Sequence, residues 1–92
     1  MEKVKDYEKV VAKVYGKDSC PYCDKVKTAL AINGIPFIYI DVKADEKAMA
    51  FVKQEWTKRN TDPTVPLVVI NDKVIGGYHD TVKHLSEELY KI

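Results

Sequence analysis

The apolar positions in the first half of the chain follow strand and helix periods in turn. Residues 10–15 are rich in β-branched and aromatic side chains, and a glycine follows, which predicts a strand that ends in a turn. Val26 and Leu30 recur at helical spacing within residues 21–33, so we expect both to face the core. Residues 37–42 show almost no polar alternation, which favours a buried parallel strand. This half therefore predicts a βαβ unit.

The next stretch of the chain predicts a second helix. A helix is expected over residues 46–59, with Asp45 as its N-cap. Its apolar stripe is expected to be part of the core and consists of Met49, Val52 and Trp56. The basic residues at its end suit the partial negative charge of a helix C-terminus.

The last third of the chain predicts a β-hairpin and a third helix. Residues 67–70 form an apolar strand, and the Asn-Asp pair after it is a tight-turn signal, so residues 73–75 should pair back antiparallel. Asp80 is expected to cap the third helix, whose apolar positions are Val82, Leu85 and Leu89. The whole pattern predicts an α/β fold, βαβ followed by ββα, with a four-stranded mixed sheet flanked by helices.

Composition narrows the class of protein only slightly. The 92 residues suit a single domain over 1–92, in which residues 1–9 form a short N-terminal extension without an assigned function. The net charge of +1 favours neither a nucleic-acid nor a membrane partner. The chain has no apolar run near the ~18 residues of a membrane span and no apolar stretch typical of a signal peptide. We therefore expect a cytoplasmic protein.

Two cysteines separated by two residues stand where the first strand leads into the first helix, a context that suits a redox dithiol. Pro21 fits the first helical position, which makes Cys20 the N-cap and Cys23 the third helical residue. The helix N-terminus favours an anion, and Lys17 adds positive charge, so we expect a lowered pKa for Cys20, the attacking nucleophile. Cys23 should be more buried and should resolve a mixed disulfide formed on Cys20.

Two other readings of the cysteine pair are weaker. A purely structural disulfide across one helical turn would close a very short loop and constrain the unfolded chain little. A zinc site is the sharper rival, because His79 and His84 have ligand-like spacing. The gap between the cysteines and the histidines, however, is far longer than the roughly 12 to 15 residues of a zinc finger. Pro21 also stands where a zinc knuckle needs a free amide. We expect no metal.

Four features in order resemble the dithiol glutaredoxins, which have the thioredoxin fold. They are the Cys20-Pro21-Tyr22-Cys23 motif, the Thr64-Val65-Pro66 segment, the Gly76-Gly77 pair, and Asp80 three residues after the second glycine. Together they cover about residues 10–91, nearly the whole chain. The resemblance implies a thioredoxin-like fold, one glutaredoxin domain, and glutathione as the reductant and cosubstrate.

The resemblance also implies a site for the cysteinyl and γ-glutamyl parts of glutathione. In the family, the proline matching Pro66 is cis and lies opposite the dithiol, and the residue matching Val65, which follows Thr64, pairs with the cysteinyl part through its backbone. In the family, the Gly-Gly-x-x-Asp stretch that matches Gly76 to Asp80 binds the γ-glutamyl end. Backbone amides near His79 and Asp80 would bind its carboxylate, and the Asp80 side chain its amino group.

The remaining implied contacts are to the glycyl carboxylate of glutathione. Lys17 and Tyr22, with Arg59, are expected to neutralise and cover it. Arg59 is the least direct transfer, since the segment before Thr64 varies in length among such proteins. His79 departs from the small residue that the family has at its position. It either crowds the γ-glutamyl pocket or adds a pH-dependent charge.

By this resemblance the chain is a glutathione-dependent thiol–disulfide oxidoreductase that reduces protein disulfides and glutathione mixed disulfides. Its implied partners are glutathione and disulfide-containing or glutathionylated proteins, with ribonucleotide reductase as a candidate, and we expect a monomer. Monothiol members have serine where this chain has Cys23, and thioredoxins have tryptophan where it has Ser19. Two alternatives stay open: a thioredoxin-like donor to ribonucleotide reductase that thioredoxin reductase recycles, and a glutathione-ligated [2Fe-2S] carrier, against which Pro21 counts.

Overall fold

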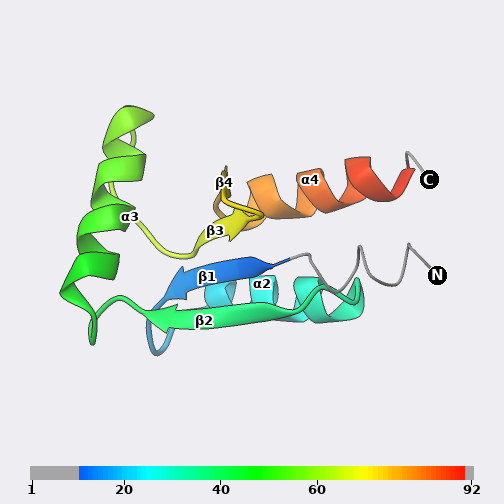
Figure 1. The fold of residues 1–92 in the computed structure, drawn as a ribbon, viewed down its shortest axis with the longest axis horizontal. Helices are drawn as coiled ribbons and strands as arrows, with labels where there is room; N and C mark the ends of the chain where they lie inside the picture. Colours follow the sequence, from blue (N-terminus) through cyan, green and yellow to red (C-terminus); the bar gives the residue numbers. More distant parts are fainter. Residues whose placement is uncertain (1–10, 91–92) are drawn as a thin grey trace.

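The computed structural model describes residues 11–90, with side chains up to residue 87, so the predicted extension at 1–9 lies outside it. In Figure 1, α3 (Glu46–Lys58) stands at one end of the molecule and α4 (Tyr78–Tyr90) extends towards the other. Among the described residues, no helix has the length and apolarity needed to cross a membrane. The elements are β1 (Ala12–Gly16), α2 (Pro21–Ile32), β2 (Phe37–Asp41), α3 (Glu46–Lys58), β3 (Leu67–Ile70), β4 (Lys73–Gly76) and α4 (Tyr78–Tyr90).

The four strands form one mixed sheet in the order β2-β1-β3-β4. β1 is parallel to β2, with Val14 opposite Tyr39, and antiparallel to β3, with Val14 opposite Val68. Asn71 and Asp72 connect β3 to β4, and their φ angles of 51° and 67° are the left-handed values that a two-residue hairpin turn favours. The structure thus confirms the βαβ and ββα order, the mixed sheet and the hairpin.

Strand β2 is parallel, as predicted, but it is not buried. It lies at the edge of the sheet, and its residues are half-buried or exposed, with Ile38 at 55% exposure. An apolar run indicates that a segment prefers to be a strand. It does not indicate whether that strand will lie in the centre or at the edge of the sheet. The prediction of a buried strand was therefore wrong.

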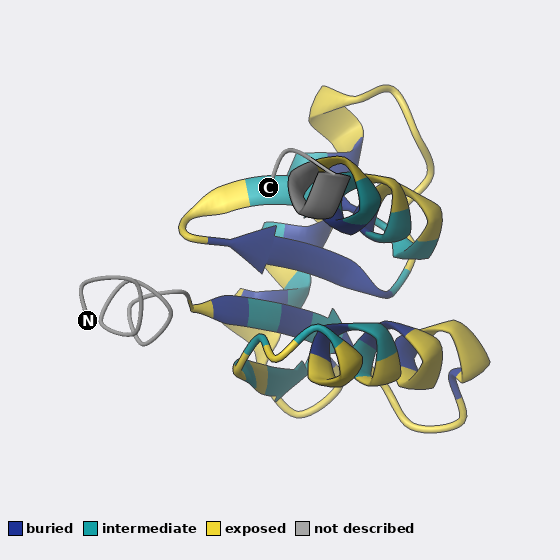
Figure 2. Cartoon of the chain, turned by 90° about the vertical axis from the view of Figure 1, so that its right-hand side faces the viewer, coloured by how far each residue is buried: buried dark blue, intermediate teal, exposed yellow. Residues whose placement is uncertain are grey.

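Two apolar clusters lie on the two faces of the sheet, because successive strand residues point to opposite sides. Figure 2 shows the buried residues gathered in the two central strands, β1 and β3, and in the helix sides that face them. The cluster between the sheet and helices α2 and α4 contains Ala12, Val14, Val26, Leu30, Val68, Ile70 and Leu85. The cluster under α3 contains Val42, Ala48, Val52, Trp56 and Leu67.

Most of the predicted core positions lie in these clusters, whereas Met49 is half-buried against the second cluster and the half-buried Val82 belongs to neither. Val26 and Leu30 are fully buried, and Val52 and Trp56 are buried on α3. Asp45 caps α3 as predicted, since its Oδ1 accepts a hydrogen bond from the Ala48 backbone N–H at 3.1 Å. The side chain of Leu89 lies outside the described residues.

Candidate functional site

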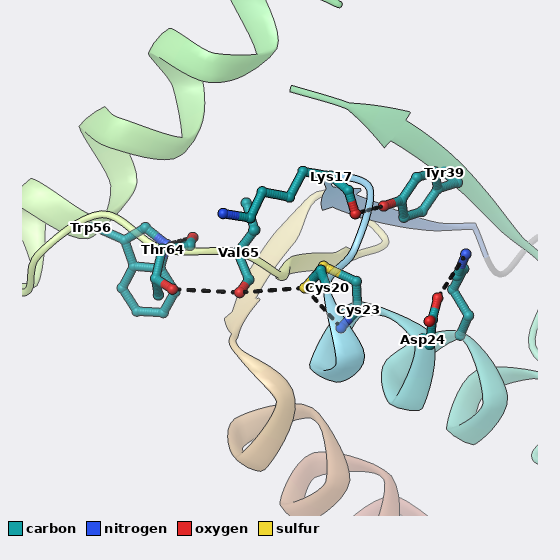
Figure 3. Close-up of a disulfide and its surroundings, with 9 residues drawn as sticks. Lys17, Cys20, Cys23, Asp24, Tyr39, Trp56, Thr64 and Val65 are labelled. Carbon is teal, nitrogen blue, oxygen red and sulfur yellow. Dashed lines mark hydrogen bonds and ion pairs between the residues drawn. A yellow bond between two sulfur atoms is a disulfide. The ribbon is translucent and has the colours of Figure 1, made fainter. Parts of the chain in front are cut away.

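The two cysteines form a disulfide at the N-terminus of α2 (Figure 3). Cys20 is the N-cap, and its Sγ accepts a hydrogen bond from the Cys23 backbone N–H at 3.1 Å. Pro21 occupies the first helical position, where a proline loses no hydrogen bond. Cys20 is 8% exposed and Cys23 only 1%. The predicted capping geometry is confirmed, and an incoming sulfur atom meets Cys20 first.

The loop before β3 faces this disulfide. The Val65–Pro66 peptide bond is cis, as expected from the resemblance. The carbonyl oxygen of Val65 lies 4.0 Å from Cys20 Sγ. The Trp56 indole Nε1 donates a hydrogen bond to the Thr64 carbonyl at 2.8 Å, so α3 holds the loop in place (Figure 3). The Val65 carbonyl, which also accepts a hydrogen bond from Thr64 Oγ1 at 3.4 Å, therefore lies next to the Cys20 sulfur.

A groove of about 260 Å³ lies beside this loop, and we call it the aromatic groove. It brings together most of the predicted glutathione-binding residues, and its lining consists of Tyr22, Thr64, Val65, Pro66, Gly77, Tyr78, His79 and Asp80. Sequence reasoning missed Tyr78, whose ring lies 5.4 Å from that of Tyr22 and 5.1 Å from that of His79, centroid to centroid. The only signal for it was an aromatic residue directly after two glycines.

Helix α4 begins at Tyr78, so the prediction that Asp80 is its N-cap was wrong. Asp80 is the third helical residue, and its Oδ2 accepts a hydrogen bond from the Gly77 backbone N–H at 3.2 Å. A carboxylate at the third helical position accepts a hydrogen bond from the backbone N–H of the residue before the helix. An aspartate near a helix start is therefore expected both at the N-cap and at this position. Gly76 has a φ of +132°, and a Cβ there would contact the Asp80 carboxylate.

The start of α4 can bind both charges of an α-amino acid. The first backbone amides of a helix have no intrahelical acceptor and favour an anion such as a carboxylate. The Asp80 carboxylate lies in the same groove and can accept a hydrogen bond from an ammonium group. The side chain of His79 also lines the groove, so both readings of its role, crowding and added charge, fit its position.

A second cavity of about 340 Å³ shares Thr64 and Val65 with the aromatic groove, and we call it the lysine cavity. Its polar lining is cationic, since it includes Lys17, Lys43 and Lys53. Its apolar lining consists of Val42, Met49, Val52 and Pro63, with Val65. Figure 3 shows the Lys17 side chain running from the loop before Cys20 towards Val65. Lys17 and Tyr22, predicted to share one carboxylate, thus line different cavities.

Arg59 lies outside both cavities. Its guanidinium donates hydrogen bonds to the backbone carbonyls of Val74 at 3.0 Å and Ile75 at 3.4 Å, and it lies 5.7 Å from the Trp56 ring. These contacts join the end of α3 to β4 and occupy the guanidinium with protein groups. We therefore omit Arg59 from the proposed site.

The histidines that suggested zinc do not join the cysteines in a ligand cluster within the described residues. His79 lines the aromatic groove, and His84 is half-buried on α4. Over the described part of the chain, no three His, Cys, Asp or Glu side chains gather as a ligand set.

Tyr39 supports the loop that carries Lys17. Its hydroxyl donates a hydrogen bond to the Lys17 carbonyl at 2.9 Å. Burial raises the pKa of Tyr39, and the carboxylates of Asp41, Asp18 and Asp24 raise it further. The hydroxyl therefore stays protonated and able to donate throughout the neutral range.

Comparison with known proteins agrees with this geometry. The family model described as Glutaredoxin matches residues 12–75. Glutaredoxin-C6 of rice (Oryza sativa subsp. japonica) is 39% identical over 71 residues, which cover 75% of this chain but only 61% of the rice protein. Glutaredoxin 3 of Escherichia coli K12 is 33% identical over 67 residues, covering 73% of this chain and 76% of its own.

Solved structures agree with the sequence comparison. A buckwheat glutaredoxin–glutathione complex superposes with a TM-score of 0.70 at 25% identity, covering 98% of this chain and 83% of that one. The match of the family model over most of the chain, the cysteine pair at the start of α2 and this shared fold lead to one conclusion. This chain belongs to the glutaredoxin family of thiol–disulfide oxidoreductases.

Proposed function

We propose that this chain uses glutathione to reduce protein disulfides and glutathione mixed disulfides. The observation that carries the proposal is the position of Cys20, whose Sγ lies 4.0 Å from the Val65 carbonyl. Val65 lines both the aromatic groove and the lysine cavity. A tripeptide whose central cysteine pairs with Val65 would extend into both of them. The buckwheat relative solved with glutathione supports this class of ligand.

The γ-glutamyl end of glutathione would bind in the aromatic groove. Its carboxylate would accept hydrogen bonds from the first-turn amides of α4, near His79 and Asp80. Its ammonium group would donate to the Asp80 carboxylate, which lines the same groove. The cysteinyl part would pair with the backbone of Val65, next to Pro66 and Thr64, and Tyr22 would cover the bound peptide.

The glycyl end would point into the lysine cavity. There the ammonium group of Lys17 would neutralise the glycyl carboxylate, because Lys17 belongs to both the loop before Cys20 and the lining of the cavity. In this orientation the Asp80 carboxylate faces the ammonium group at one end of the peptide, and the Lys17 ammonium group faces the carboxylate at the other end. It also leaves the central sulfur next to Cys20.

Reduction of a glutathione mixed disulfide requires two exchanges. The Cys20 thiolate attacks the glutathione sulfur, which forms a Cys20–glutathione disulfide and releases the substrate as a thiolate that takes up a proton. A second glutathione thiolate then attacks the glutathione sulfur of this adduct. Glutathione disulfide leaves, and Cys20 returns to the thiolate. The Cys23 backbone N–H, which lies 3.1 Å from Cys20 Sγ, stabilises that thiolate in both steps.

Reduction of a protein disulfide also uses Cys23. The Cys20 thiolate attacks one substrate sulfur and releases the other, and the Cys23 thiolate then attacks Cys20 Sγ and releases the reduced protein. The product is the Cys20–Cys23 disulfide seen in the structure. Two glutathione molecules reduce it and leave as glutathione disulfide.

The decisive experiment couples turnover to NADPH oxidation through glutathione reductase. Wild type, Cys20→Ser and Cys23→Ser are compared with glutathione and a small glutathionylated disulfide as substrate. We expect wild type and Cys23→Ser to turn over and Cys20→Ser to be inactive. Loss of this activity in a folded Cys23→Ser variant would contradict the assignment of Cys20 as sufficient for deglutathionylation.

The same samples test the two alternatives. If all three proteins are inactive with glutathione and thioredoxin reductase reduces the wild type, the chain is a thioredoxin-like donor and the proposed glutathione site is wrong. Visible absorbance of the protein as purified tests the [2Fe-2S] carrier, since a colourless sample argues against a bound cluster.

A further inference from the structure

The lysine cavity has features that glutathione would leave unused. On the proposed function the glycyl carboxylate meets Lys17, and a glycyl residue has no side chain. Met49 and Pro63 line the cavity as accessible apolar surface that such a ligand does not cover, above the buried Val42 and Val52. Lys43 and Lys53 add two cations beyond the one that a single carboxylate requires.

The charge of this cavity is not balanced from within. Its lining contains no acidic side chain. Among the described residues the ion pairs are Lys27 with Asp24 and Lys58 with Glu55, so none of the cavity lysines takes part in one. Asp41 accepts a hydrogen bond from the backbone N–H of Lys43 but does not line the cavity. Acidic groups of a ligand would therefore meet three unpaired ammonium groups beside an apolar surface.

The position of the cavity defines which part of a substrate reaches it. Thr64 and Val65 line both cavities, so a chain that pairs with Val65 continues from the aromatic groove into the lysine cavity. In glutathione the residue on the lysine side follows the cysteine. A protein substrate held in the same direction places there the residues that come after its attacked cysteine.

We propose that the lysine cavity binds the segment of a protein disulfide that follows the attacked cysteine, and selects an apolar residue followed by acidic residues. This inference rests on the proposed function, which supplies the direction of the bound chain. The apolar side chain would cover Met49 and Pro63, and the acidic side chains would pair with Lys43 and Lys53. The cavity would thus make the rate of reduction of a protein disulfide depend on the residues that follow the attacked cysteine.

The test uses the symmetrical disulfides of three short peptides, each blocked at both ends. After the cysteine they carry Leu-Glu-Glu, Leu-Lys-Lys or Ser-Glu-Glu. Reduced protein reacts with each disulfide to give the Cys20–Cys23 disulfide and two peptide thiols, so no further reductant is needed. The rate constant for thiol release is measured by chromatography and divided by that of the same peptide with dithiothreitol, which removes differences in intrinsic reactivity.

We expect the Leu-Glu-Glu disulfide to react about tenfold faster than Leu-Lys-Lys at low salt, and about threefold faster than Ser-Glu-Glu. High salt should reduce the first ratio and leave the second, because salt screens charge and not apolar contact. Equal rates for all three peptides in the wild type would overturn the proposal. A fourth disulfide carries Leu-Glu-Glu before the cysteine, and a faster reaction of this peptide than of the one with Leu-Glu-Glu after the cysteine would overturn the direction.

Two double variants with the same change in net charge locate the effect. Lys43→Glu/Lys53→Glu should reverse the preference between the acidic and basic peptides. Lys73→Glu/Lys83→Glu should keep it, because these exposed lysines line none of the cavities described. An equal loss of preference in both variants would mean that overall charge is responsible, which would contradict a local site.

The glutathione assay separates this proposal from the proposed function. If wild type turns over the glutathionylated disulfide but shows no peptide preference, the cavity assignment alone is wrong. If it shows the preference but has no activity with glutathione, the glutathione site is wrong, while the cavity still selects acidic substrates.

Discussion

At the scale of single residues, the Tyr39 side chain packs close to both the loop before Cys20 and the buried Cys23. A Cβ added to Gly16 would lie 2.6 Å from the Tyr39 hydroxyl oxygen and 2.9 Å from Cys23 Sγ. The hydroxyl therefore lies close to the buried cysteine as well as donating to the Lys17 carbonyl. Only a glycine at position 16 leaves room for this packing. The close contact between the end of β1, the loop before Cys20 and β2 therefore depends on Gly16.

Replacing this hydroxyl should weaken the fold. We expect Tyr39→Phe to lower the free energy of unfolding by about 1 kcal/mol, the usual net value of a hydrogen bond. Tyr15→Phe is the matched control, because Tyr15 contacts Phe51 through its ring and donates no hydrogen bond in the described part of the structure. That variant should stay within about 0.5 kcal/mol of wild type. Urea unfolding of the oxidised proteins measures both, and equal losses would contradict the role given to the Tyr39 hydroxyl.

The raised pKa of Tyr39 also predicts a pH dependence. Burial, and then the carboxylates of Asp41, Asp18 and Asp24, raise this pKa above the ordinary value of 10.0 that the unfolded chain has. The contribution of Tyr39 to stability is thus complete below pH 10.0 and is lost as the pH rises through the higher folded-state pKa. The difference in unfolding free energy between wild type and Tyr39→Phe should shrink from about pH 9 to about pH 11. A difference that grows over this interval would contradict the prediction.

Residues whose roles depend on local geometry could be predicted from the sequence, and residues that depend on distant packing could not. Cys20 was recognised as the N-cap because Pro21 and the preceding strand suffice to define the helix start. Arg59 was assigned to a ligand, although it donates to the carbonyls of β4. That contact exists only because the hairpin packs beside the end of α3, which no local pattern contains.

At the scale of elements, the start of α4 combines a glycine constraint with a helix cap. Gly76 takes a φ of +132°, a region that side-chain-bearing residues avoid, while the Asp80 carboxylate occupies the space of a Cβ. In this arrangement the Gly77 backbone N–H donates a hydrogen bond to Asp80 Oδ2 at 3.2 Å. The aromatic groove therefore depends on this turn for its shape.

A side chain at position 76 should be costly. We expect Gly76→Ala to destabilise the protein by more than about 2 kcal/mol, since backbone strain and the contact with Asp80 add. Gly34→Ala is the control, because Gly34 has a φ of +71° but nothing within 4 Å of an added Cβ. It should cost about 1 kcal/mol from strain alone. Thermal or urea unfolding compares them, and a smaller loss for Gly76→Ala than for Gly34→Ala would refute this account.

The type of each element, helix or strand, was predictable because the spacing of apolar residues differs between the two. The neighbours of a strand in the sheet and the exact first residue of a helix were not predictable. The run of residues 37–42 was correctly identified as a parallel strand, yet strand order made it an edge. Asp80 was taken for a cap, yet it acts from the third helical position. In both cases one sequence signal is compatible with two arrangements, and long-range pairing selects between them.

At the scale of the whole molecule, the site lies where parts held by different apolar clusters meet. Helix α2, which carries the cysteines, packs through the cluster shared with α4, and the loop at Val65 belongs to the cluster under α3. The order of motifs along the chain indicated that these parts meet. The division into two cavities was not predictable, because it depends on how α3 is placed against the loop before β3.

Trp56 links α3 to the site, which leads to a prediction for the molecule as a whole. Its indole N–H donates to the Thr64 carbonyl at 2.8 Å, and its side chain is 6% exposed. Trp56→Phe leaves that carbonyl without its donor and removes packing volume, so we expect a loss of about 2 to 3 kcal/mol in unfolding free energy. Because the loop at Val65 is then less well held, KM for the glutathionylated disulfide should rise about fivefold with kcat retained.

Phe51→Leu provides the comparison that separates site geometry from stability. Phe51 packs in the same cluster against Tyr15, with ring centroids 5.1 Å apart, and its side chain has no group that could donate a hydrogen bond to the loop. We expect it to cost about 1 kcal/mol in stability and to leave KM unchanged. Steady-state kinetics at a temperature where both variants are folded decides between the two effects. If KM rises equally in both, weakening of the α3 cluster as a whole is responsible, and the single hydrogen bond from Trp56 does not position the loop.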